Sequence, residues 1–303
     1  MPSVSDPVQS EWIDGVLVEH RNILTNGVRL HCAIAGPEDG PLVVALHGFP
    51  EFWRGMSGVV VALAQAGYRV VAPDQRGYGL SEKPRGIDAY RIEELTADVV
   101  GIIAAFDRDT SYVVGHDWGA AVAWWLSITR PDLVERVAVL NVPHPSVFAR
   151  EVRSNRRQLR KSWYIFAIQV PWLPEQLAFG SRTRRRFARS IARTANPGSF
   201  DPDYLAGLES AWSQPGAGTG MMNWYRASVR RRPERLADKR VHVPILIIWG
   251  RQDVALSDTM VAPSAELCDD VRVVFFDDAT HWVLHDEPEA TARLIVEFFG
   301  TPA

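Results

Sequence analysis

Short apolar runs alternate along the chain with longer stretches whose apolar residues have helical spacing. The apolar runs predict strands at residues 16–24, 28–35, 42–46, 68–72, 113–115, 134–140, 244–249 and 271–276. Several runs are apolar without interruption, which is typical of strands buried on both faces of a parallel sheet. The stretches with helical spacing include residues 90–106 and 287–299. This alternation favours an α/β fold with a mostly parallel sheet and helices on both faces.

Two features interrupt the alternation. Asn26-Gly27 separates the first two predicted strands, and this dipeptide favours a tight antiparallel hairpin. After the sixth predicted strand, residues 146–232 become rich in arginine and tryptophan, with helical spacing and little strand character. We therefore predict a core made of residues 1–145 and 233–303, with residues 146–232 inserted as a helical cap.

Composition narrows the class of protein. The chain has 303 residues, of which 47% are hydrophobic, and a net charge of −3, so we expect a large buried core and no nucleic-acid partner. Cys32 and Cys268 lie far apart without metal-ligand spacing, which argues against a disulfide framework or a metal site. The chain shows no apolar signal core and no run long enough to span a bilayer, so we expect a cytoplasmic protein.

The segment Gly115-His116-Asp117-Trp118-Gly119 has the pattern of a nucleophile elbow, a sharp turn between a strand and a helix. Glycines flank the central residue because its backbone is strained and its neighbours pack closely. Such a turn would hold the side chain of Asp117 at the carboxyl end of the sheet, where α/β proteins bind ligands. The alternative is that Asp117 only caps the following helix.

Asp253 and His281 each follow a later predicted strand, so the chain presents a nucleophile, an acid and a histidine in that order. This is the order of the catalytic triad in hydrolases with the α/β-hydrolase fold, and we expect that fold here. Other residues compete for the same two roles: His116, His144 and His285 as the histidine, and Asp277 and Asp278 as the acid.

A carboxylate nucleophile changes the reaction. Aspartate has an ordinary pKa of about 3.9, so it is charged at neutral pH and needs no base in order to attack. Asp117 would displace a leaving group from a saturated carbon and form an ester. His281, oriented by Asp253, would then activate water for attack on the ester carbonyl. The backbone N–H groups of Phe49 and Trp118 would form the oxyanion hole.

Residues 47–50, 115–119, 253 and 281–282 together resemble the epoxide hydrolases of the α/β-hydrolase fold. The haloalkane dehalogenases share much of this pattern. The resemblance covers nearly the whole chain and implies hydrolysis of an epoxide to a vicinal diol, with no metal or organic cofactor. We expect the substrate pocket to be lined by Phe49, Pro50, Trp118 and Trp282.

Epoxide hydrolases hold the epoxide oxygen with two cap tyrosines, and the resemblance assigns this role to Tyr164 and Tyr225. Tyr164 lies five residues before a Gln-x-Pro motif, and Tyr225 lies in Asn-Trp-Tyr-Arg. A phenol with a pKa near 10 stays protonated at pH 7 and can donate to the opening ring. A departing halide prefers N–H donors, and Phe49 stands where dehalogenases often carry asparagine. The sequence therefore favours an epoxide substrate.

Two alternatives to an epoxide hydrolase are a hydrolytic dehalogenase and a non-catalytic ligand receptor of the same fold. The receptor is disfavoured because every candidate catalytic position holds a chemically competent residue. The eleven arginines between Arg150 and Arg193 would suit an anionic lipid or an acidic substrate, but solvated helices explain them more simply. We expect a small apolar epoxide as the binding partner, and a homodimer is compatible with the sequence.

Overall fold

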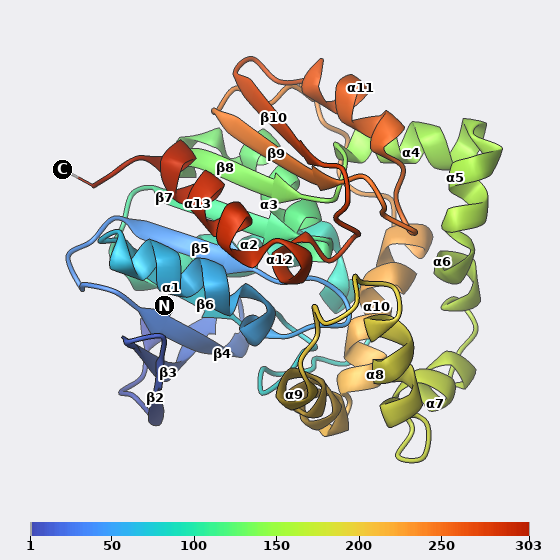
Figure 1. Cartoon of the computed structure of the whole chain (residues 1–303), viewed down its shortest axis with the longest axis horizontal. Helices are drawn as coiled ribbons and strands as arrows, with labels where there is room; N and C mark the ends of the chain where they lie inside the picture. The colour runs from blue at the N-terminus through green and yellow to red at the C-terminus, as the bar shows by residue number, and fades with distance from the viewer. Residues whose placement is uncertain (1, 303) are drawn as a thin grey trace.

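A single sheet of ten strands forms the centre of the computed structural model, which describes residues 2–302 (Figure 1). The strands run in the order β1-β3-β4-β6-β5-β7-β8-β9-β10, and β2 pairs with β3. Strands β5 to β10 pair in parallel, whereas the pairings among β1 to β4, and between β4 and β6, are antiparallel. The strand bounds are β1 Ser3–Val4, β2 Gln9–Ile13, β3 Val16–Thr25, β4 Val28–Ala35, β5 Leu42–Leu46, β6 Arg69–Pro73, β7 Ser111–His116, β8 Val134–Leu140, β9 Ile245–Gly250 and β10 Val271–Phe276.

Helices cover both faces of the sheet. On one face α1, α12 and α13 lie together, and on the other face lie α2 and α3 (Figure 1). The bounds of these helices and of α11 are α1 Ser57–Gln65, α2 Ile92–Ala105, α3 Trp118–Thr129, α11 Val261–Ala265, α12 Val283–Asp286 and α13 Pro288–Phe299. Short 3₁₀ turns lie at Trp53–Met56, Asp88–Tyr90, Pro131–Leu133 and Asp258–Met260.

The uninterrupted apolar run of β5 is explained by its position between two cores. Val43 and Ala45 pack under α1 and α13, whereas Val44 and Leu46 pack under α2 and α3. Successive side chains of a strand point to opposite faces, so a strand that is covered on both sides needs apolar residues at every position. The predicted parallel sheet with two helical layers is thus confirmed.

The N-terminal part of the sheet contains both a confirmed prediction and a missed one. Asn26 and Gly27 have φ angles of 43° and 73° and form the tight turn of the β3–β4 hairpin, as their sequence predicts. Strands β1 and β2 were not expected, because edge strands with one exposed face lack a continuous apolar run. The helical segment therefore follows the eighth strand of the chain rather than the sixth.

Residues 145–230 contain helices and no strand, and we call this segment the cap. It lies beyond the carboxyl ends of the parallel strands, on the right of Figure 1. Within residues 2–302, the longest helices have 14 residues, and no helix has both the length and the apolar character needed to cross a bilayer. The cap helices are α4 Pro145–Ser154, α5 Arg156–Lys161, α6 Trp163–Ala167, α7 Leu173–Phe179, α8 Arg184–Ala192, α9 Pro202–Ser213 and α10 Ala217–Arg230.

Candidate active site

Asp117 occupies the sharp turn between β7 and α3. Its φ and ψ angles of 50° and −120° are strained for a residue with a side chain. The turn is possible only because its neighbours are small. A Cβ on Gly115 would lie 2.4 Å from the carbonyl oxygen of Gly119, and a Cβ on Gly119 would lie 2.1 Å from the carbonyl oxygen of Leu46. The Asp117 carboxylate consequently projects from the end of the sheet toward the cap.

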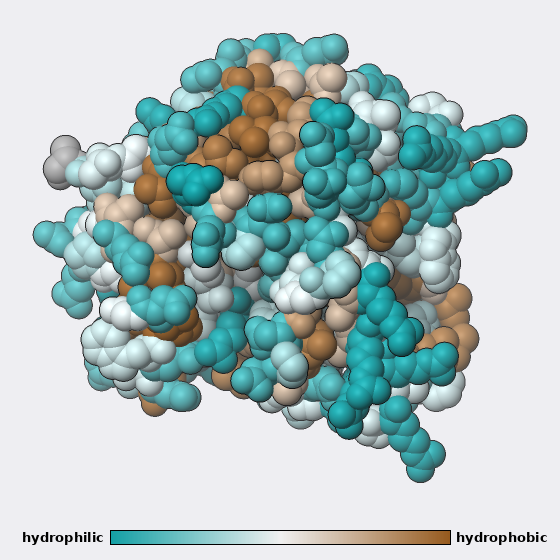
Figure 2. Space-filling view, viewed as in Figure 1, coloured by the Kyte–Doolittle hydropathy of each residue, from teal (hydrophilic) through white to brown (hydrophobic). Residues whose placement is uncertain are grey.

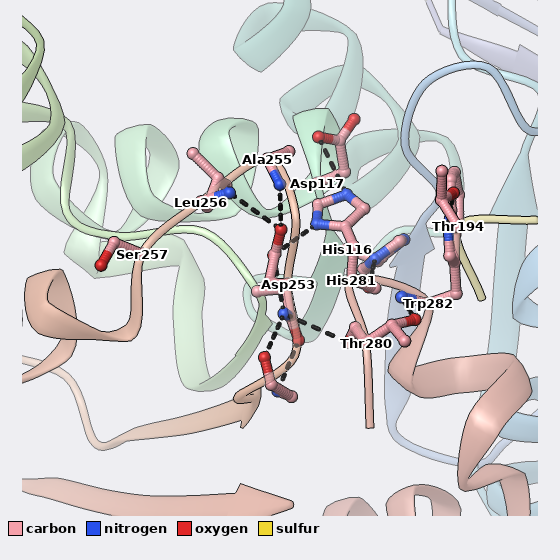
Figure 3. A network of polar contacts seen from close by, with 12 residues as sticks. His116, Asp117, Thr194, Asp253, Ala255, Leu256, Ser257, Thr280, His281 and Trp282 are labelled. Carbon is pink, nitrogen blue, oxygen red and sulfur yellow. Dashed lines mark hydrogen bonds and ion pairs between the residues drawn. The ribbon is translucent and has the colours of Figure 1, made fainter. Parts of the chain in front are cut away.

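His281 lies between two carboxylates that come from different strand ends (Figure 3). Its Nδ1 is 2.7 Å from Oδ2 of Asp253, in the loop after β9. Its Nε2 is 3.5 Å from Oδ2 of Asp117. Both His281 and Asp253 are buried, so water screens these contacts only weakly. The three residues that the sequence predicts as nucleophile, acid and histidine therefore lie in one connected arrangement.

Hydrogen bonds from four directions fix the carboxylate of Asp253. Its Oδ1 accepts the backbone N–H groups of Ala255 and Leu256 at 2.7 and 2.8 Å. Its Oδ2 accepts the side-chain amide of Asn141 at 2.9 Å in addition to the imidazole of His281. Asn141 follows β8 and was not among the residues expected at the site. Its position at a strand end was the available signal that it belongs to the site.

The competing residues have other partners or lie at the surface. The His285 imidazole bonds to Glu51, and the His144 imidazole bonds to the backbone carbonyl of Lys239. Asp277 and Asp278 are exposed and do not contact His281. Of the histidines and acids that the sequence left open, the imidazole–carboxylate pair that lies beside Asp117 is therefore His281 with Asp253.

The two carboxylates set the charge of His281. Burial by itself lowers the pKa of the imidazole, but Asp253 and then Asp117 outweigh it and raise the pKa to about 10. Burial would likewise raise the pKa of Asp253, yet the imidazole of His281 and the amide of Asn141 hold it below its ordinary value. At neutral pH the arrangement is thus an imidazolium between two carboxylates.

Phe49 provides a backbone donor at the nucleophile. Its N–H donates to Oδ1 of Asp117 at 2.7 Å. Gly48 allows this approach, because a Cβ at that position would lie 2.3 Å from Cβ of Asp117. Trp118 begins α3, whose first N–H groups have no partner within the helix. Of the two predicted donors, the N–H of Phe49 contacts the Asp117 carboxylate, and that of Trp118 follows Asp117 in the chain.

A cavity of about 580 Å³ lies between the sheet and the cap. Asp117 and Trp118 line it from the core, and Tyr164 of α6 and Tyr225 of α10 line it from the cap. The rings of the two tyrosines meet edge to face with their centroids 5.8 Å apart. Burial raises the pKa of both phenols and the Asp117 carboxylate raises it further, so both stay protonated at neutral pH. The remaining wall is mostly apolar and includes Val142, Phe148, Ile165 and Leu256.

Three of the four residues expected to line the pocket lie outside its wall. Of Phe49, Pro50, Trp118 and Trp282, only Trp118 lines the cavity. The Phe49 ring packs edge to face on Tyr225, at a centroid distance of 5.1 Å, and so supports the wall from behind. The carbonyl of Pro50 accepts the indole N–H of Trp212. The indole of Trp282 donates to Thr194 at 2.8 Å (Figure 3). These contacts join residues far apart in sequence, so the motif alone could not show them.

A buried glutamate below the triad was missed in the sequence. Glu51 is 1% exposed, and its Oε1 accepts the His285 imidazole at 2.6 Å and the Tyr204 hydroxyl. Its Oε2 lies 3.3 Å from Nδ1 of His116, whose Nε2 donates to the backbone carbonyl of His281 at 2.8 Å. Burial would raise the pKa of Glu51, but His285 and His116 hold it well below its usual range. The position of Glu51 directly after the 47–50 motif was the available signal.

The same region contains no cluster suited to a metal. Within residues 2–302, no three histidine, cysteine, aspartate or glutamate side chains are grouped in a way that could hold a metal ion. Cys32 and Cys268 are both buried and unpaired by disulfide. The polar side chains that line the cavity include the Asp117 carboxylate and the phenols of Tyr164 and Tyr225, together with Glu93, Ser228 and arginines 91, 153, 231 and 232.

Comparison with known proteins agrees with this geometry. Residues 41–288 match the family model described as the alpha/beta hydrolase fold. The AB hydrolase superfamily protein YfhM of Bacillus subtilis is 43% identical over 94% of this chain and 99% of its own length. Epoxide hydrolase 1 of Caenorhabditis elegans is 34% identical over 93% of this chain and 70% of its own length. The crystal structure of Epoxide Hydrolase A from Mycobacterium thermoresistibile has a TM-score of 0.82, with 30% identity over 94% of this chain and 99% of that chain.

The fold, the arrangement of Asp117, Asp253 and His281 at the strand ends and these relatives lead to the same assignment. Relatives at 30% identity or more, matched along most of both chains, share the fold and its family. The chain belongs to the epoxide hydrolases of the α/β-hydrolase fold.

Proposed function

We propose that the chain converts an epoxide and water to a vicinal diol in two steps, through an ester on Asp117. The observation that carries this mechanism is the shared cavity, in which one carboxylate from the core meets two protonated phenols from the cap. A weak nucleophile such as a carboxylate opens a strained ring much faster if the departing oxygen receives a proton. The two phenols supply that proton at the place where the oxygen would leave.

In the first step, the free oxygen of Asp117 attacks. Oδ1 is held by the N–H of Phe49, which leaves Oδ2 to form the bond to an epoxide carbon. The ring C–O bond breaks toward oxygen, and that oxygen takes the proton of Tyr164 or Tyr225. The product of this step is an alkyl ester whose carbonyl oxygen is Oδ1, already beside a backbone donor.

Ester formation changes the charge of His281. The Asp117 carboxylate raises the pKa of the imidazole, and the ester has no charge. The pKa of His281 therefore falls when the ester forms, and the imidazolium returns a proton to the tyrosinate. The enzyme thus produces its own base only after the nucleophile has reacted.

In the second step, neutral His281 takes a proton from water, and the water oxygen bonds to Cγ of Asp117. The negative charge that develops on Oδ1 is stabilised by the N–H of Phe49 and, in this proposal, by that of Trp118. The ester oxygen then leaves with the diol and takes the proton of the new carboxyl group. Asp117 is again ionised and His281 is again protonated, as at the start.

Trapping the ester tests the proposal. His281→Gln keeps a side chain of similar size but removes the base, so the first step should proceed and the second should stop. We would treat this variant with styrene oxide and measure the mass of the intact protein and of its peptides. The expected result is a gain of one styrene oxide on the peptide that contains Asp117.

A second variant and a second reagent make the experiment decisive. His281→Gln combined with Asp117→Asn should gain no mass, because the amide is a poor nucleophile. Treatment with 1-bromobutane tests the dehalogenase alternative. An adduct from bromobutane alone, or an epoxide adduct on another peptide, would contradict the proposal.

A further inference from the structure

The outer face of the cap carries a stripe of exposed apolar side chains. Half of the fourteen large hydrophobic residues that are exposed in residues 2–302 fall within residues 159–177. They lie on three short helices, α5, α6 and α7, and in the turn between α6 and α7. The seven residues of this stripe, with their exposed fractions, are Leu159 42%, Trp163 67%, Phe166 50%, Val170 47%, Trp172 67%, Leu173 47% and Leu177 64%.

Basic residues flank the stripe on both sides. Residues 150–193 contain eleven arginines and one lysine but only two glutamates, so this segment carries +10 while the whole chain carries −3. Five arginines lie on α4 and α5, before and at the beginning of the stripe, and six follow it on α8 and its flanking residues. In Figure 2, hydrophilic side chains project from the upper and lower parts of the right-hand edge, and hydrophobic surface lies between them.

These charges are not used within the protein. Ten of the eleven arginines are exposed. Arg150 forms an ion pair with the neighbouring Glu151 at 3.8 Å, and the other ten have no carboxylate partner among residues 2–302. Two arginines that follow this segment are paired instead: Arg226 binds Glu175 and Arg231 binds Asp88. The cap face is therefore both apolar and cationic, with its charge uncompensated.

We infer that this face, residues 150–193, docks on the surface of a membrane that contains anionic lipids. Apolar and tryptophan side chains on one side of a helical surface enter the headgroup region, and flanking arginines bind the anionic headgroups. The apolar stripe matches the first of these requirements, and the arginines on both sides of it match the second. The protein would lie on the bilayer without crossing it.

A second copy of the chain fits this face less well. In a two-fold dimer the same patch meets itself, so a segment with +10 would lie against another segment with +10. Like charges in close contact oppose association. A surface of anionic lipids instead gives every exposed arginine a partner.

The position of the cavity gives the docking a consequence, which rests on the proposed function. Tyr164 and Ile165 of α6 line the cavity, and Trp163 of the same helix faces outward. Arg153 and Phe166 line the cavity and are also exposed, so its mouth adjoins the docking face. Apolar epoxides concentrate in bilayers. A docked enzyme would take them from the lipid directly into the cavity.

Vesicle flotation tests the docking independently of catalysis. The probes are vesicles of phosphatidylcholine alone and vesicles with equal parts of phosphatidylcholine and phosphatidylglycerol. The chain should float with the anionic vesicles only and should dissociate at about 1 M salt, where the Debye length falls to about 3 Å. The variant Asp117→Asn should float equally well, so a failure of docking and a failure of the proposed chemistry can be distinguished.

Two sets of substitutions locate the docking face. The triple variant Arg156→Gln, Arg157→Gln, Arg160→Gln should lower the partition coefficient by about a hundredfold. The double variant Trp163→Ser, Trp172→Ser should lower it by at least about tenfold, because indole burial is lost. Neither set contains residues that line the cavity, so turnover of a water-soluble epoxide without vesicles should stay unchanged and show that the variants fold.

Matched substitutions elsewhere serve as controls. Trp12→Ser removes an indole that is 71% exposed on β2, and the triple variant Arg85→Gln, Arg235→Gln, Arg293→Gln removes three exposed arginines outside the cap. Both controls should float like the unmodified chain. The inference fails if the anionic vesicles do not bind the chain, or if the cap variants bind as well as the controls. It also fails if the chain does not bind vesicles and light scattering shows instead a dimer that dissociates only when the two tryptophans are substituted.

Discussion

Nε2 of His281 lies 3.5 Å from Oδ2 of Asp117. Nδ1, on the opposite side of the same ring, lies 2.7 Å from Oδ2 of Asp253. Two carboxylates therefore stabilise one imidazolium, and the pKa of His281 rises to about 10 despite its burial. Only one of the two carboxylates persists through the proposed reaction. In the proposed reaction, the loss of charge on Asp117 is what allows His281 to act as a base.

Substitution of the nucleophile should lower the pKa of His281. Asp117→Asn removes a negative charge and an acceptor beside Nε2 and retains the shape of the side chain, so the imidazolium loses stabilisation. We expect a fall of about one unit or more, measured by NMR titration of the imidazole C–H groups. A pKa of His281 that is equal in the variant and the unmodified chain would contradict the proposed timing of proton transfer.

Removal of the cap phenols should slow ring opening. Tyr164→Phe and Tyr225→Phe each keep the ring but remove a proton donor, so we expect the rate of ester formation to fall about tenfold to a hundredfold for each, and further for both together. Stopped-flow measurement of a single turnover separates this step from hydrolysis. Tyr112→Phe, whose ring packs on Tyr68 and Phe299 far from the cavity, is the control and should react at the normal rate.

Two glycine substitutions should have opposite effects on stability. Gly119→Ala would place a Cβ 2.1 Å from the backbone carbonyl of Leu46, and backbone cannot rotate away, so we expect a loss of about 3 kcal/mol and of activity. Gly58→Ala on α1 meets no atom within 4 Å and should stabilise the protein by up to about 1 kcal/mol. Denaturant unfolding of both variants measures the contrast, and equal effects would show that packing at the elbow is looser than described.

The buried Glu51 should make the free energy of unfolding depend on pH in the acid range. The pKa of Glu51 is lower in the folded protein than in the unfolded chain. Ionised Glu51 therefore stabilises the folded state fully above the unfolded pKa of about 4.3, and this stabilisation is lost as the pH falls through the lower folded value. Glu51→Gln should cost about 3 kcal/mol at neutral pH and should lose less stability than the unmodified chain between about pH 5 and pH 3.

Thermal unfolding at several pH values measures this dependence. Glu289→Gln, an exposed glutamate on α13, is the control and should change neither the stability at neutral pH nor its decline in acid. A parallel decline for Glu51→Gln and the unmodified chain would show that the contacts of Glu51 with His285 and His116 do not carry the acid sensitivity.

Some features of the fold could be predicted from the sequence because they depend on local physical rules. The elbow at Asp117 follows from glycines at 115 and 119, since only small residues permit that turn. The hairpin at Asn26-Gly27 and the doubly covered strand β5 follow from backbone preference and from the period of side chains along a strand. Each of these depends on residues that are neighbours along the chain.

Only the tertiary structure decided between chemically equivalent candidates. Asp253 and Asp277 both follow strands, but Asp253 alone reaches His281, 28 positions away. The sequence predicted Trp282 in the pocket wall, but its indole donates to Thr194 and does not line the cavity. Glu51 and His285 are 234 positions apart and became partners only because the strand ends converge. Spacing along the chain fixes local backbone shape, whereas contacts between distant residues depend on how the whole sheet and its cap are packed.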